Sequence, residues 1–295
     1  MNILGIDIGG TKVSYSIIDS DLNFIHTTKK NNRNTDFRDI VGDMILEIKK
    51  NLMEFEFESI GISLPGLIKT KTGEMNLPNL INYKGVNLKS SIEKEFGVKV
   101  TLTDDREALV LGEHSYFKNK NMAVIIIGTG IGLGIIINDN VLKSEESPIG
   151  AIGWNMVYDK LLSKTARLED LISGPALAEY TSKLNPNSNI NGAKTFFEQV
   201  DMGSKLAKYY LEDCTDNLAT QISYILNLIP MERIVINGSV GIELFNRSKN
   251  ELIHKIKELV NPFIRQKFSI ESSLLRENAF NLGAVINTLK DKDRD

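Results

Sequence analysis

The chain is 295 residues long, with 42% hydrophobic and 25% charged residues, so it can bury a sizeable core and favours two domains over one. Its formal net charge of −3 gives no general reason to bind nucleic acid or an anionic membrane. One cysteine, Cys214, excludes an internal disulfide. Neither a basic leader nor a membrane-length apolar stretch is evident, so we expect a cytoplasmic protein.

The first predicted elements are two strands joined by a glycine turn. Residues 3–6 and 13–18 are β-rich, mostly apolar runs, and Asp7-Ile8-Gly9-Gly10-Thr11-Lys12 lies between them. Glycines let successive backbone N–H groups converge, and converging N–H groups bind phosphate. In this turn Asp7 can orient hydrated Mg²⁺, Thr11 can donate its hydroxyl to a phosphate, and Lys12 supplies a positive charge.

Strand and helix patterns alternate in the next stretch. Apolar residues recur every four positions from Ile40 to Leu52, which predicts an amphipathic helix. Residues 24–28 and 59–64 are predicted strands, and the second of them ends in Pro65-Gly66. A helix at 88–96, a strand at 98–102 and a helix at 107–117 complete this half.

A second glycine turn opens the other half of the chain. Gly128-Thr129-Gly130-Ile131-Gly132 lies between the apolar runs 123–127 and 133–137. Both turns lead into a strand rather than a helix, which excludes a dinucleotide-binding fingerprint, and no P-loop is present. A glycine hairpin alone is usually only a turn, but two of them suggest two phosphate-cradling edges that face one another across a cleft. We expect helices at 169–183, 194–200, 203–228, 242–259 and 274–289, a surface loop at 185–192, and a strand at 234–236 that runs into Asn237-Gly238-Ser239.

The repeated hairpins resemble the duplicated architecture of the actin, hexokinase and Hsp70 superfamily. This resemblance implies an α/β fold of the ribonuclease-H-like (actin-like ATPase) type, with two domains around a nucleotide and sugar cleft. We expect an N-terminal domain at 1–117, with a C-terminal helix of about 276–295 packing back on it. Residues 118–275 would form a larger C-terminal domain.

Several motifs, in order and spacing, resemble those of the ROK family of bacterial sugar kinases and sugar-responsive repressors. The opening D-x-G-G-T-K matches residues 7–12, and the G-T-G-x-G-x-G motif matches Gly128 to Gly134. The softer matches are Gly61-Ile62-Ser63-Leu64-Pro65-Gly66, Pro78-Asn79-Leu80, residues 103–113 against E-N-D-A-N-A-A-A-L-G-E, Leu168-Glu169, Asn237-Gly238-Ser239-Val240 and Gly283-Ala284.

The chain departs from the family pattern at three places. The G-E-I-G-H segment, whose Glu and His hydrogen-bond the sugar around C1 and C2, is Gly150-Ala151-Ile152-Gly153-Trp154 here. The zinc-binding cysteines found beside it in many members are missing from residues 161–167, so we expect no zinc site. The family's N-D-A-N is Asp104-Asp105-Arg106-Glu107, which keeps the catalytic aspartate but makes both flanking positions acidic.

The resemblance implies an ATP-dependent sugar kinase that phosphorylates a hexose or hexosamine, with the 6-hydroxyl as the favoured acceptor. Asp105 would be the general base, Mg²⁺ would bridge the phosphates, and Asp7 would contact the metal mostly through water. The implied ATP-binding residues are Asp7, Gly9, Gly10, Thr11, Lys12, Gly128, Thr129, Gly130, Gly132, Gly238 and Ser239. The implied sugar-binding residues are Gly66, Asn79, Asp104 and Glu169.

Simpler interpretations stay open for most of these residues. Asp105 is as well suited to capping the helix at 107–117 as to catalysis. Glu169 also fits the role of an ordinary acidic residue in the first turn of a helix. Lys12 fits a solvated strand position, Asn79 fits a turn after a proline, and Trp154 fits packing better than stacking on a sugar.

Other functions remain open as well. The crowding of acidic side chains near Asp105 suggests an amino sugar or another cationic acceptor, unless Arg106 neutralises part of it. Ala151 and Trp154 also fit a catalytically degenerate sugar or nucleotide sensor with a regulatory role. The P-G and D-D-R-E segments disfavour a phosphotransferase that acts on acetate or another non-sugar. The lack of a winged helix before the first strand disfavours a repressor. The resemblance further implies a homodimer whose ligands are a small sugar and ATP, with no nucleic acid and no membrane.

Overall fold

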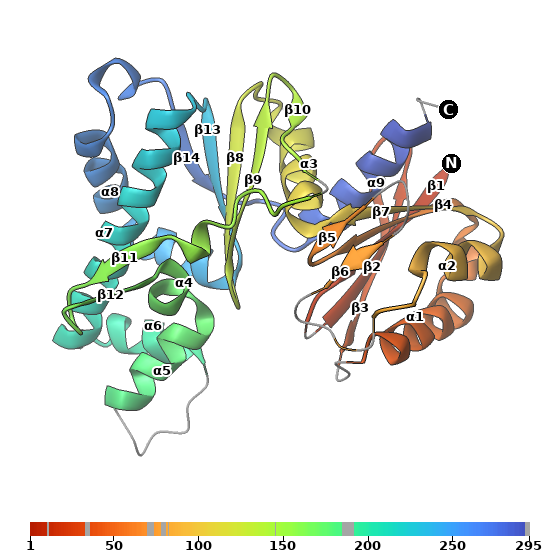
Figure 1. Ribbon diagram of the computed structural model, residues 1–295, viewed down its shortest axis with the longest axis horizontal. Coiled ribbons are helices and arrows are strands. Elements are labelled where there is room, and N and C mark those ends of the chain that lie inside the picture. Colours follow the sequence, from red (N-terminus) through yellow and green to blue (C-terminus); the bar gives the residue numbers. More distant parts are fainter. Residues whose placement is uncertain are drawn as a thin grey trace. The chain divides into compact units, whose positions relative to one another are not determined.

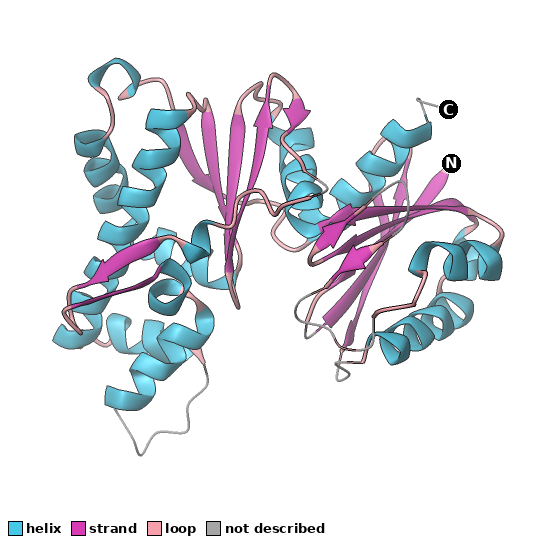
Figure 2. Ribbon diagram, viewed as in Figure 1, coloured by secondary structure: helices cyan, strands magenta, loops and turns pink. Residues whose placement is uncertain are grey.

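The structure, a computed structural model, describes residues 1–10, 12–32, 36–69, 74–77, 81, 83–144, 146–184 and 192–292. The chain forms two compact units, each with its own five-stranded sheet (Figures 1 and 2). Unit 1 comprises Met1–Lys118, Val141–Ile149 and Glu277–Asp295, and unit 2 comprises Asn119–Asn140 and Gly150–Arg276. Within the described ranges, no helix is long and apolar enough to cross a membrane.

The sheet of unit 1 combines an antiparallel meander with parallel strands, in the order β3-β2-β1-β4-β7. The meander is β1 (Asn2–Ile8), β2 (Lys12–Asp19) and β3 (Phe24–Asn31), and β4 (Phe57–Leu64) and β7 (Lys99–Asp104) continue it in parallel. Parallel neighbours need crossover connections, which contain α1 (Phe37–Asn51) and α2 (Leu88–Phe96). The shorter elements of this unit are η1 (Met53–Phe55), β5 (Leu67–Ile68) and β6 (Met75–Asn76).

Two further helices, α3 (Asp105–Phe117) and α9 (Asn278–Lys292), belong to unit 1 and pack against each other (Figure 1). Helix α9 lies so close to β1 that a Cβ on Gly5 would be 2.6 Å from the carbonyl oxygen of Asn281. The buried Asn281 amide donates to the carbonyls of Gly5 (2.9 Å) and Ser14 (3.1 Å), which fixes the helix to β1 and β2. Helix α9 therefore packs on the first sheet, and it starts at Asn278, four residues after the start of the helix predicted at 274–289.

Unit 2 repeats the same strand order as β10-β9-β8-β13-β14. Strands β8 and β9 form an antiparallel hairpin, and β13 and β14 continue it in parallel. The sequence reveals only the two hairpins, whereas the structure extends the repeat to whole sheets. The strands are β8 (Met122–Ile127), β9 (Ile131–Ile137), β10 (Asn140–Val141), β13 (Arg233–Asn237) and β14 (Ser269–Ser272), with a separate ribbon of β11 (Met156–Asp159) and β12 (Lys164–Arg167).

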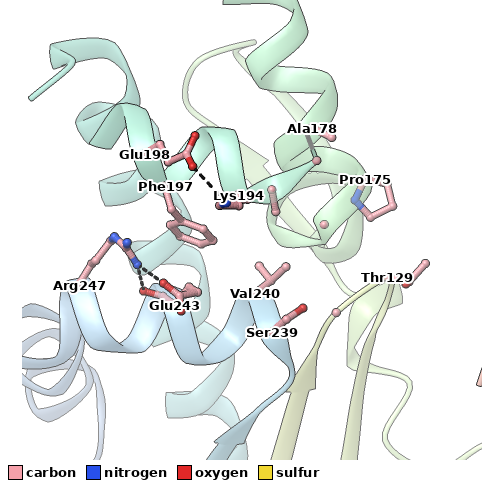
Figure 3. A pocket seen from close by; sticks show the side chains of 14 residues that line it. Thr129, Pro175, Ala178, Lys194, Phe197, Glu198, Ser239, Val240, Glu243 and Arg247 are labelled. Atoms are coloured by element: carbon pink, nitrogen blue, oxygen red, sulfur yellow. Dashed lines mark hydrogen bonds and ion pairs between the residues drawn. The ribbon is translucent and has the colours of Figure 1, made fainter. Parts of the chain in front are cut away.

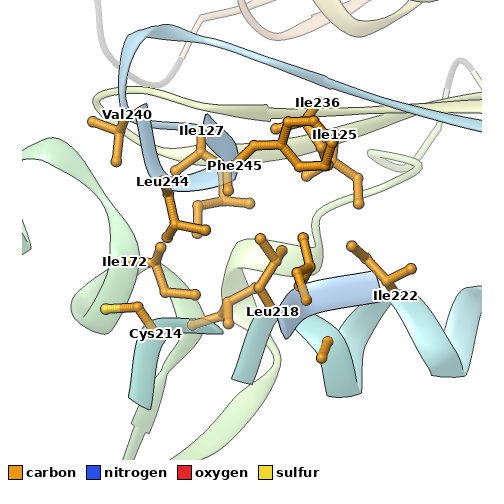
Figure 4. Packing of buried hydrophobic residues seen from close by; sticks show 14 of the residues in the cluster. Ile125, Ile127, Ile172, Cys214, Leu218, Ile222, Ile236, Val240, Leu244 and Phe245 are labelled. Carbon is orange, nitrogen blue, oxygen red and sulfur yellow. The ribbon is translucent and has the colours of Figure 1, made fainter. Parts of the chain in front are cut away.

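Helices cover the second sheet and form the larger apolar core. Figure 4 shows Ile125 and Ile127 of β8 beside Leu218 of α7 and Phe245 of α8, all of them buried. The helical elements are η2 (Ile152–Trp154), α4 (Leu168–Ile172), α5 (Gly174–Leu184), α6 (Ala193–Asp201), α7 (Lys205–Leu228), α8 (Ser239–Leu259) and η3 (Pro262–Ile264).

Two predicted helix boundaries are wrong in a way that matters for the site. The single helix expected at 169–183 is two helices, separated by Ser173 in an extended conformation. The break lets the N–H of Gly174 donate to the carbonyl of Gly128 at 2.7 Å, which attaches α5 to the second glycine turn. Helix α3 begins at Asp105 rather than Glu107. Of the loop predicted at 185–192, residues 185–191 lie outside the described part of the chain.

Candidate active site

The acidic residues of unit 1 gather where its parallel strands end. Asp7 of β1 pairs in register with Ser63 of β4, and Leu64 of β4 pairs with Asp104 of β7. The Ser63 hydroxyl donates to Asp7 Oδ1 at 2.8 Å. Burial raises the pKa of Asp7 to about 7, although the Ser63 hydrogen bond partly opposes this shift. Sheet edges of this kind are where open α/β folds place their ligands.

Asp104, not Asp105, caps helix α3. Its carboxylate accepts from the Arg106 backbone N–H at 2.9 Å and from the Arg106 guanidinium at 3.0 and 2.5 Å. The guanidinium also donates to the carbonyl of Ile149 at 3.1 Å, so it is held from two sides. The capping role that the sequence left open for Asp105 is therefore filled by its neighbour, and that interpretation of Asp105 is wrong.

Asp105 is the first residue of α3, with 34% of its side chain exposed. Burial and the neighbouring Asp104 carboxylate raise the pKa of Asp105 to about 7, and the Asp7 carboxylate adds to the shift. Arg106 Nε lies 3.7 Å from Asp105 Oδ1, and its positive charge partly opposes this rise in pKa. A partly accessible carboxylate that takes up and releases protons near neutral pH is suited to general base catalysis.

The remaining acid of this segment, Glu107, has its own partner. Burial raises its pKa, and the Lys143 ammonium, 3.1 Å from its carboxylate, opposes that shift. Together with the pair of Asp104 and Arg106, this contact balances two of the acidic charges that the sequence crowds together. The structure therefore weakens the reason for expecting a cationic acceptor.

The first glycine turn is closed by a hydrogen bond from Gly9 N–H to the Lys12 carbonyl at 2.9 Å. A Cβ on the exposed Gly10 would meet no atom within 4 Å, so its backbone is open to a ligand. Lys12 is exposed at the start of β2, and Thr11 lies outside the described residues. Of the expected sugar ligands on this unit, Gly66 has φ +126° and packs against the carbonyl of Asn76, while Asn79 lies outside the described residues.

The second glycine turn lies on unit 2 and borders a cavity. Gly128 N–H donates to the Gly130 carbonyl at 3.0 Å, and Thr129 at the tip is exposed. Gly132 already belongs to β9, where it pairs with Ile126. A Cβ on Gly128, like one on Gly10, would meet no atom within 4 Å, but the Gly128 N–H and carbonyl are already hydrogen-bonded to Gly130 and Gly174.

This cavity of about 710 Å³ is of a size that holds a small-molecule ligand. Figure 3 shows Phe197 of α6 and Val240 of α8 at the cavity, with Arg247 beside them. The Arg247 guanidinium lies 4.8 Å from the centroid of the Phe197 ring and is held by Asp201 and Glu243. The lining comprises Gly128, Thr129, Gly174, Pro175, Ala178, Gly192, Ala193, Lys194, Phe197, Glu198, Ser239, Val240, Glu243 and Arg247.

The turn between β13 and α8 contains the two residues, Gly238 and Ser239, that the sequence predicts at the adenosine. Gly238 has φ +85°, and a Cβ there would be 2.3 Å from the carbonyl oxygen of Ile127. Only glycine fits this close crossing without strain. Ser239 follows as the first residue of α8, exposed and lining the cavity. The structure thus brings Gly128, Thr129 and Ser239, three expected ATP ligands, to one cavity.

Glu169 lies beside both the second glycine turn and the segment that departs from the family pattern. Its Oε2 would be 3.5 Å from a Cβ on Gly130 and 2.9 Å from one on Gly153. Arg167 Nη1 lies 3.4 Å from Glu169 Oε1. Trp154 is 66% exposed, so the interpretation of this side chain as a packing residue is wrong.

The sequence analysis did not identify four residues that contact the predicted site residues or line the unit 2 cavity. Ser63 is a polar residue inside a buried strand, a signal that could have been noticed in the apolar run 60–64. Phe197 and Arg247 lie on separate helices and meet only in the folded unit, so no local pattern marks them. Arg167 belongs to a short ribbon that was not predicted.

Two five-stranded sheets of the same order, each opened by a glycine hairpin, define the ribonuclease-H-like fold of the actin-like ATPases. The model of the ROK family matches residues 3–290. The chain belongs to the ROK family.

Relatives with sequence similarity span most or all of the chain. An uncharacterized protein of Clostridium perfringens is 31% identical over 247 residues, which is 80% of each chain. A glucokinase of Thermotoga maritima is 25% identical and covers 97% of this chain and 96% of its own.

Solved structures share the fold at lower sequence identity. The ROK hexokinase of Thermus thermophilus has a TM-score of 0.82 at 19% identity, covering 99% of this chain and 100% of its own. The glucokinase of Streptomyces griseus, in complex with glucose and AMPPNP, has a TM-score of 0.80 at 20% identity, covering 97% of this chain and 99% of its own. A ROK family transcriptional regulator, a homologue of the E. coli MLC protein, has a TM-score of 0.83 at 21% identity, covering 97% of this chain and 77% of its own.

Proposed function

We propose that this chain is an ATP-dependent kinase that transfers the γ-phosphoryl group to a sugar hydroxyl, and we take the 6-hydroxyl as the acceptor. The observation that carries the proposal is the state of Asp105, a partly exposed carboxylate that is free of the capping role and has a pKa of about 7. A base whose pKa lies near the working pH is the most effective. The glucokinase of T. maritima supports the same class of reaction.

In the proposed reaction Asp105 accepts the proton of the sugar hydroxyl and orients its oxygen. That oxygen forms a bond to the γ-phosphorus while the bond from this phosphorus to the β,γ-bridging oxygen breaks, which leaves ADP. Asp105 then releases its proton to solvent. Asp104 and Glu169, each oriented by an arginine, would accept hydrogen bonds from ring hydroxyls, with Gly66 and Asn79 completing the sugar contacts.

The residues present fit ATP, because the unit 2 cavity is large enough and there is open space beside the Cα atoms of Gly10 and Gly128. The two turns would bind the phosphates through backbone N–H groups. When bound, Mg²⁺ neutralises phosphate charge, and Asp7 would hold it mostly through water. The proposed ATP contacts are Asp7, Gly9, Gly10, Thr11, Lys12, Gly128, Thr129, Gly130 and Gly132 at the phosphates, and Gly238 and Ser239 at the adenosine.

A neutral sugar fits the site better than a cationic one. Arg106 faces Asp104, Lys143 faces Glu107 and Arg167 faces Glu169, so three carboxylates already have a basic partner. An added ammonium group would have to compete with these contacts. We extend the proposal to a cytoplasmic homodimer only on the family resemblance.

The test is ADP release from Mg-ATP in the presence of glucose, mannose, fructose, glucosamine, N-acetylglucosamine or N-acetylmannosamine. We expect sugar-dependent turnover in the wild type and a loss of at least about a hundredfold in Asp105→Asn, the scale of a general base contribution. Asp39→Asn is the matched control, because Asp39 is an exposed acid in the first turn of α1 in the same unit.

The possible outcomes separate the proposed roles. Equal turnover in Asp105→Asn and the wild type would refute the role of Asp105. No turnover with any sugar, despite ATP binding in calorimetry, would refute the kinase and favour the sensor that Ala151 and Trp154 suggest.

A further inference from the structure

Unit 2 has a second cavity, of about 540 Å³, beside the one proposed for ATP. It lies where the β11–β12 ribbon meets the helices α4 and α5 (Figure 1). Among the described residues that line it, four carboxylates outnumber one ammonium group: Asp159, Glu169, Asp170 and Glu179 against Lys164. This excess of negative charge favours a cationic ligand.

An arginine beside the cavity already pairs with two of these acids. Arg167 donates to both carboxylate oxygens of Asp170 at 2.9 and 2.8 Å, and its Nη1 lies 3.4 Å from Glu169 Oε1. The charges at the start of α4 are therefore partly balanced by the protein itself.

Asp159, at the end of β11, is the acid that points to a ligand. Only 4% of this residue is exposed, and its Oδ1 accepts from the Leu162 backbone N–H at 2.9 Å. No hydrogen bond or ion pair from the described part of the chain reaches its Oδ2, although the residue lines the cavity. A buried carboxylate is costly unless it is paired. A cation in the cavity would supply the missing partner.

The acids are not arranged for a metal ion. Within the described ranges, no three His, Cys, Asp or Glu side chains are grouped so that they could hold one. The carboxylates come instead from separate elements, with Asp159 ending β11 and Glu169 and Asp170 in the first turn of α4. Separated carboxylates suit a ligand whose positive charges are also apart.

Other parts of the lining suit a carbon chain. The buried rings of Tyr180 and Tyr210 stack with their centroids 3.8 Å apart. Both hydroxyls already donate to backbone carbonyls, at 2.9 and 3.0 Å, and Ala176 adds only a methyl group. Ring and methyl surface of this kind can pack against the methylene groups between two ammonium groups.

Ser173 connects this cavity to the second glycine turn. It lines the cavity at the break between α4 and α5, and the next residue, Gly174, donates to the Gly128 carbonyl at 2.7 Å. Pro175 lines both this cavity and the proposed ATP cavity. A cation that fixes this break would also fix the turn proposed to hold the phosphates, and its charge would attract them.

We propose that this cavity is a regulatory site for an organic cation with two or more ammonium groups, a di- or polyamine, and that its occupation tightens ATP binding. One ammonium group pairs with Asp159, and another with the other acids of the lining. The effect on ATP rests on the proposed ATP site, whereas the binding of the amine does not.

Isothermal titration calorimetry with spermidine tests the site, in Mg²⁺-free buffer whose salt screens exposed surface charges. We expect one spermidine per chain, and an affinity about tenfold lower in Asp159→Asn, the scale of a charged hydrogen bond. Asparagine keeps an acceptor for the Leu162 N–H, so this variant should fold as the wild type does, which circular dichroism checks. Thr165→Lys adds a positive charge at an exposed position of the lining and should also weaken binding.

Glu258→Gln is the matched control, because Glu258 is an exposed acid of α8 in the same unit and outside the cavity lining. It should bind spermidine as the wild type does. The proposed site would be overturned by wild-type protein that binds no spermidine, by equal affinity in Asp159→Asn, or by an equal loss in Glu258→Gln. Displacement of spermidine by Mg²⁺ alone would assign the cavity to an inorganic cation and overturn it as well.

Titration with AMPPNP and Mg²⁺, with and without saturating spermidine, tests the regulatory effect. We expect spermidine to raise the affinity for AMPPNP about fivefold in the wild type and not in Asp159→Asn. Spermidine that binds the nucleotide in solution affects both proteins alike, so an equal change in both would refute the regulation.

Sugar turnover keeps this proposal apart from the kinase proposal. Spermidine binding that depends on Asp159, without turnover of any sugar, would refute the kinase and keep the amine site. Turnover of a sugar by a protein that does not bind spermidine would refute the amine site and keep the kinase.

Discussion

Replacing Asp105 by asparagine should abolish activity and at the same time stabilise the fold above neutral pH. Burial and the Asp104 carboxylate raise the pKa of Asp105 from 3.8 to about 7, so the folded protein disfavours the charged form. A shift of about three units corresponds to roughly 4 kcal/mol. Because 34% of the side chain is exposed, solvent screening reduces the expected stabilisation to on the order of 1–2 kcal/mol.

The sign of the effect follows from proton binding. Between about pH 4 and pH 7 the folded state binds more protons at Asp105 than the unfolded state does, so the wild type loses stability as the pH rises through this window. Below the window both states are protonated and the penalty vanishes. The free energy of unfolding of Asp105→Asn should therefore exceed that of the wild type above about pH 7, with the difference shrinking towards pH 4.

Urea unfolding followed by far-ultraviolet circular dichroism measures this difference at about pH 4.5 and pH 8. Asp39→Asn, an exposed acid in the same unit, should match the wild type at both values. The argument would be refuted by an Asp105→Asn variant that is less stable than the wild type at pH 8, or by a difference that does not change with pH.

Three further outcomes are expected. For the wild type, kcat/KM should fall about tenfold per pH unit below about pH 7 as Asp105 takes up its proton, and a flat profile down to about pH 5 would contradict its role as base. Gly238→Ala should lose about 1–3 kcal/mol of stability, because φ is +85° and the new Cβ would be 2.3 Å from the Ile127 carbonyl, whereas Gly10→Ala should keep its stability and bind ATP more weakly. Urea denaturation measures the stability of the two glycine variants, and calorimetry measures their ATP binding. An equal loss of stability in both variants would argue against open space at the first turn. Ser239→Tyr should place its ring in the unit 2 cavity and weaken ATP binding about tenfold, with a stability change within about 0.5 kcal/mol; unchanged binding in calorimetry would place the adenosine elsewhere.

Local patterns in the sequence were enough to predict the two hairpins and most helices. Helix α2 has the predicted bounds of 88–96, because its apolar spacing lies between the Asn87 cap and Gly97 in the left-handed conformation. The duplicated fold followed from two glycine turns and the family resemblance. The break at Ser173 could not be predicted, since it depends on the hydrogen bond between Gly174 and the distant Gly128.

The candidate site was predictable only in part, for the same reason. Motif matching selected Asp105, but the assignment of the helix cap to Asp104 required the position of Arg106. The exposure of Trp154 is a property of the folded unit that no local pattern in the sequence indicates. Residues such as Phe197 become part of a cavity only through packing between helices, which residue spacing does not encode.

Phosphorus NMR of wild-type protein incubated with Mg-ATP and the active acceptor tests the central claim most directly. The account predicts a new phosphate monoester signal coupled to the protons of the sugar C6, in an amount equal to the ADP formed. ATP that stays unchanged although it binds, or ADP accompanied only by inorganic phosphate, would contradict it.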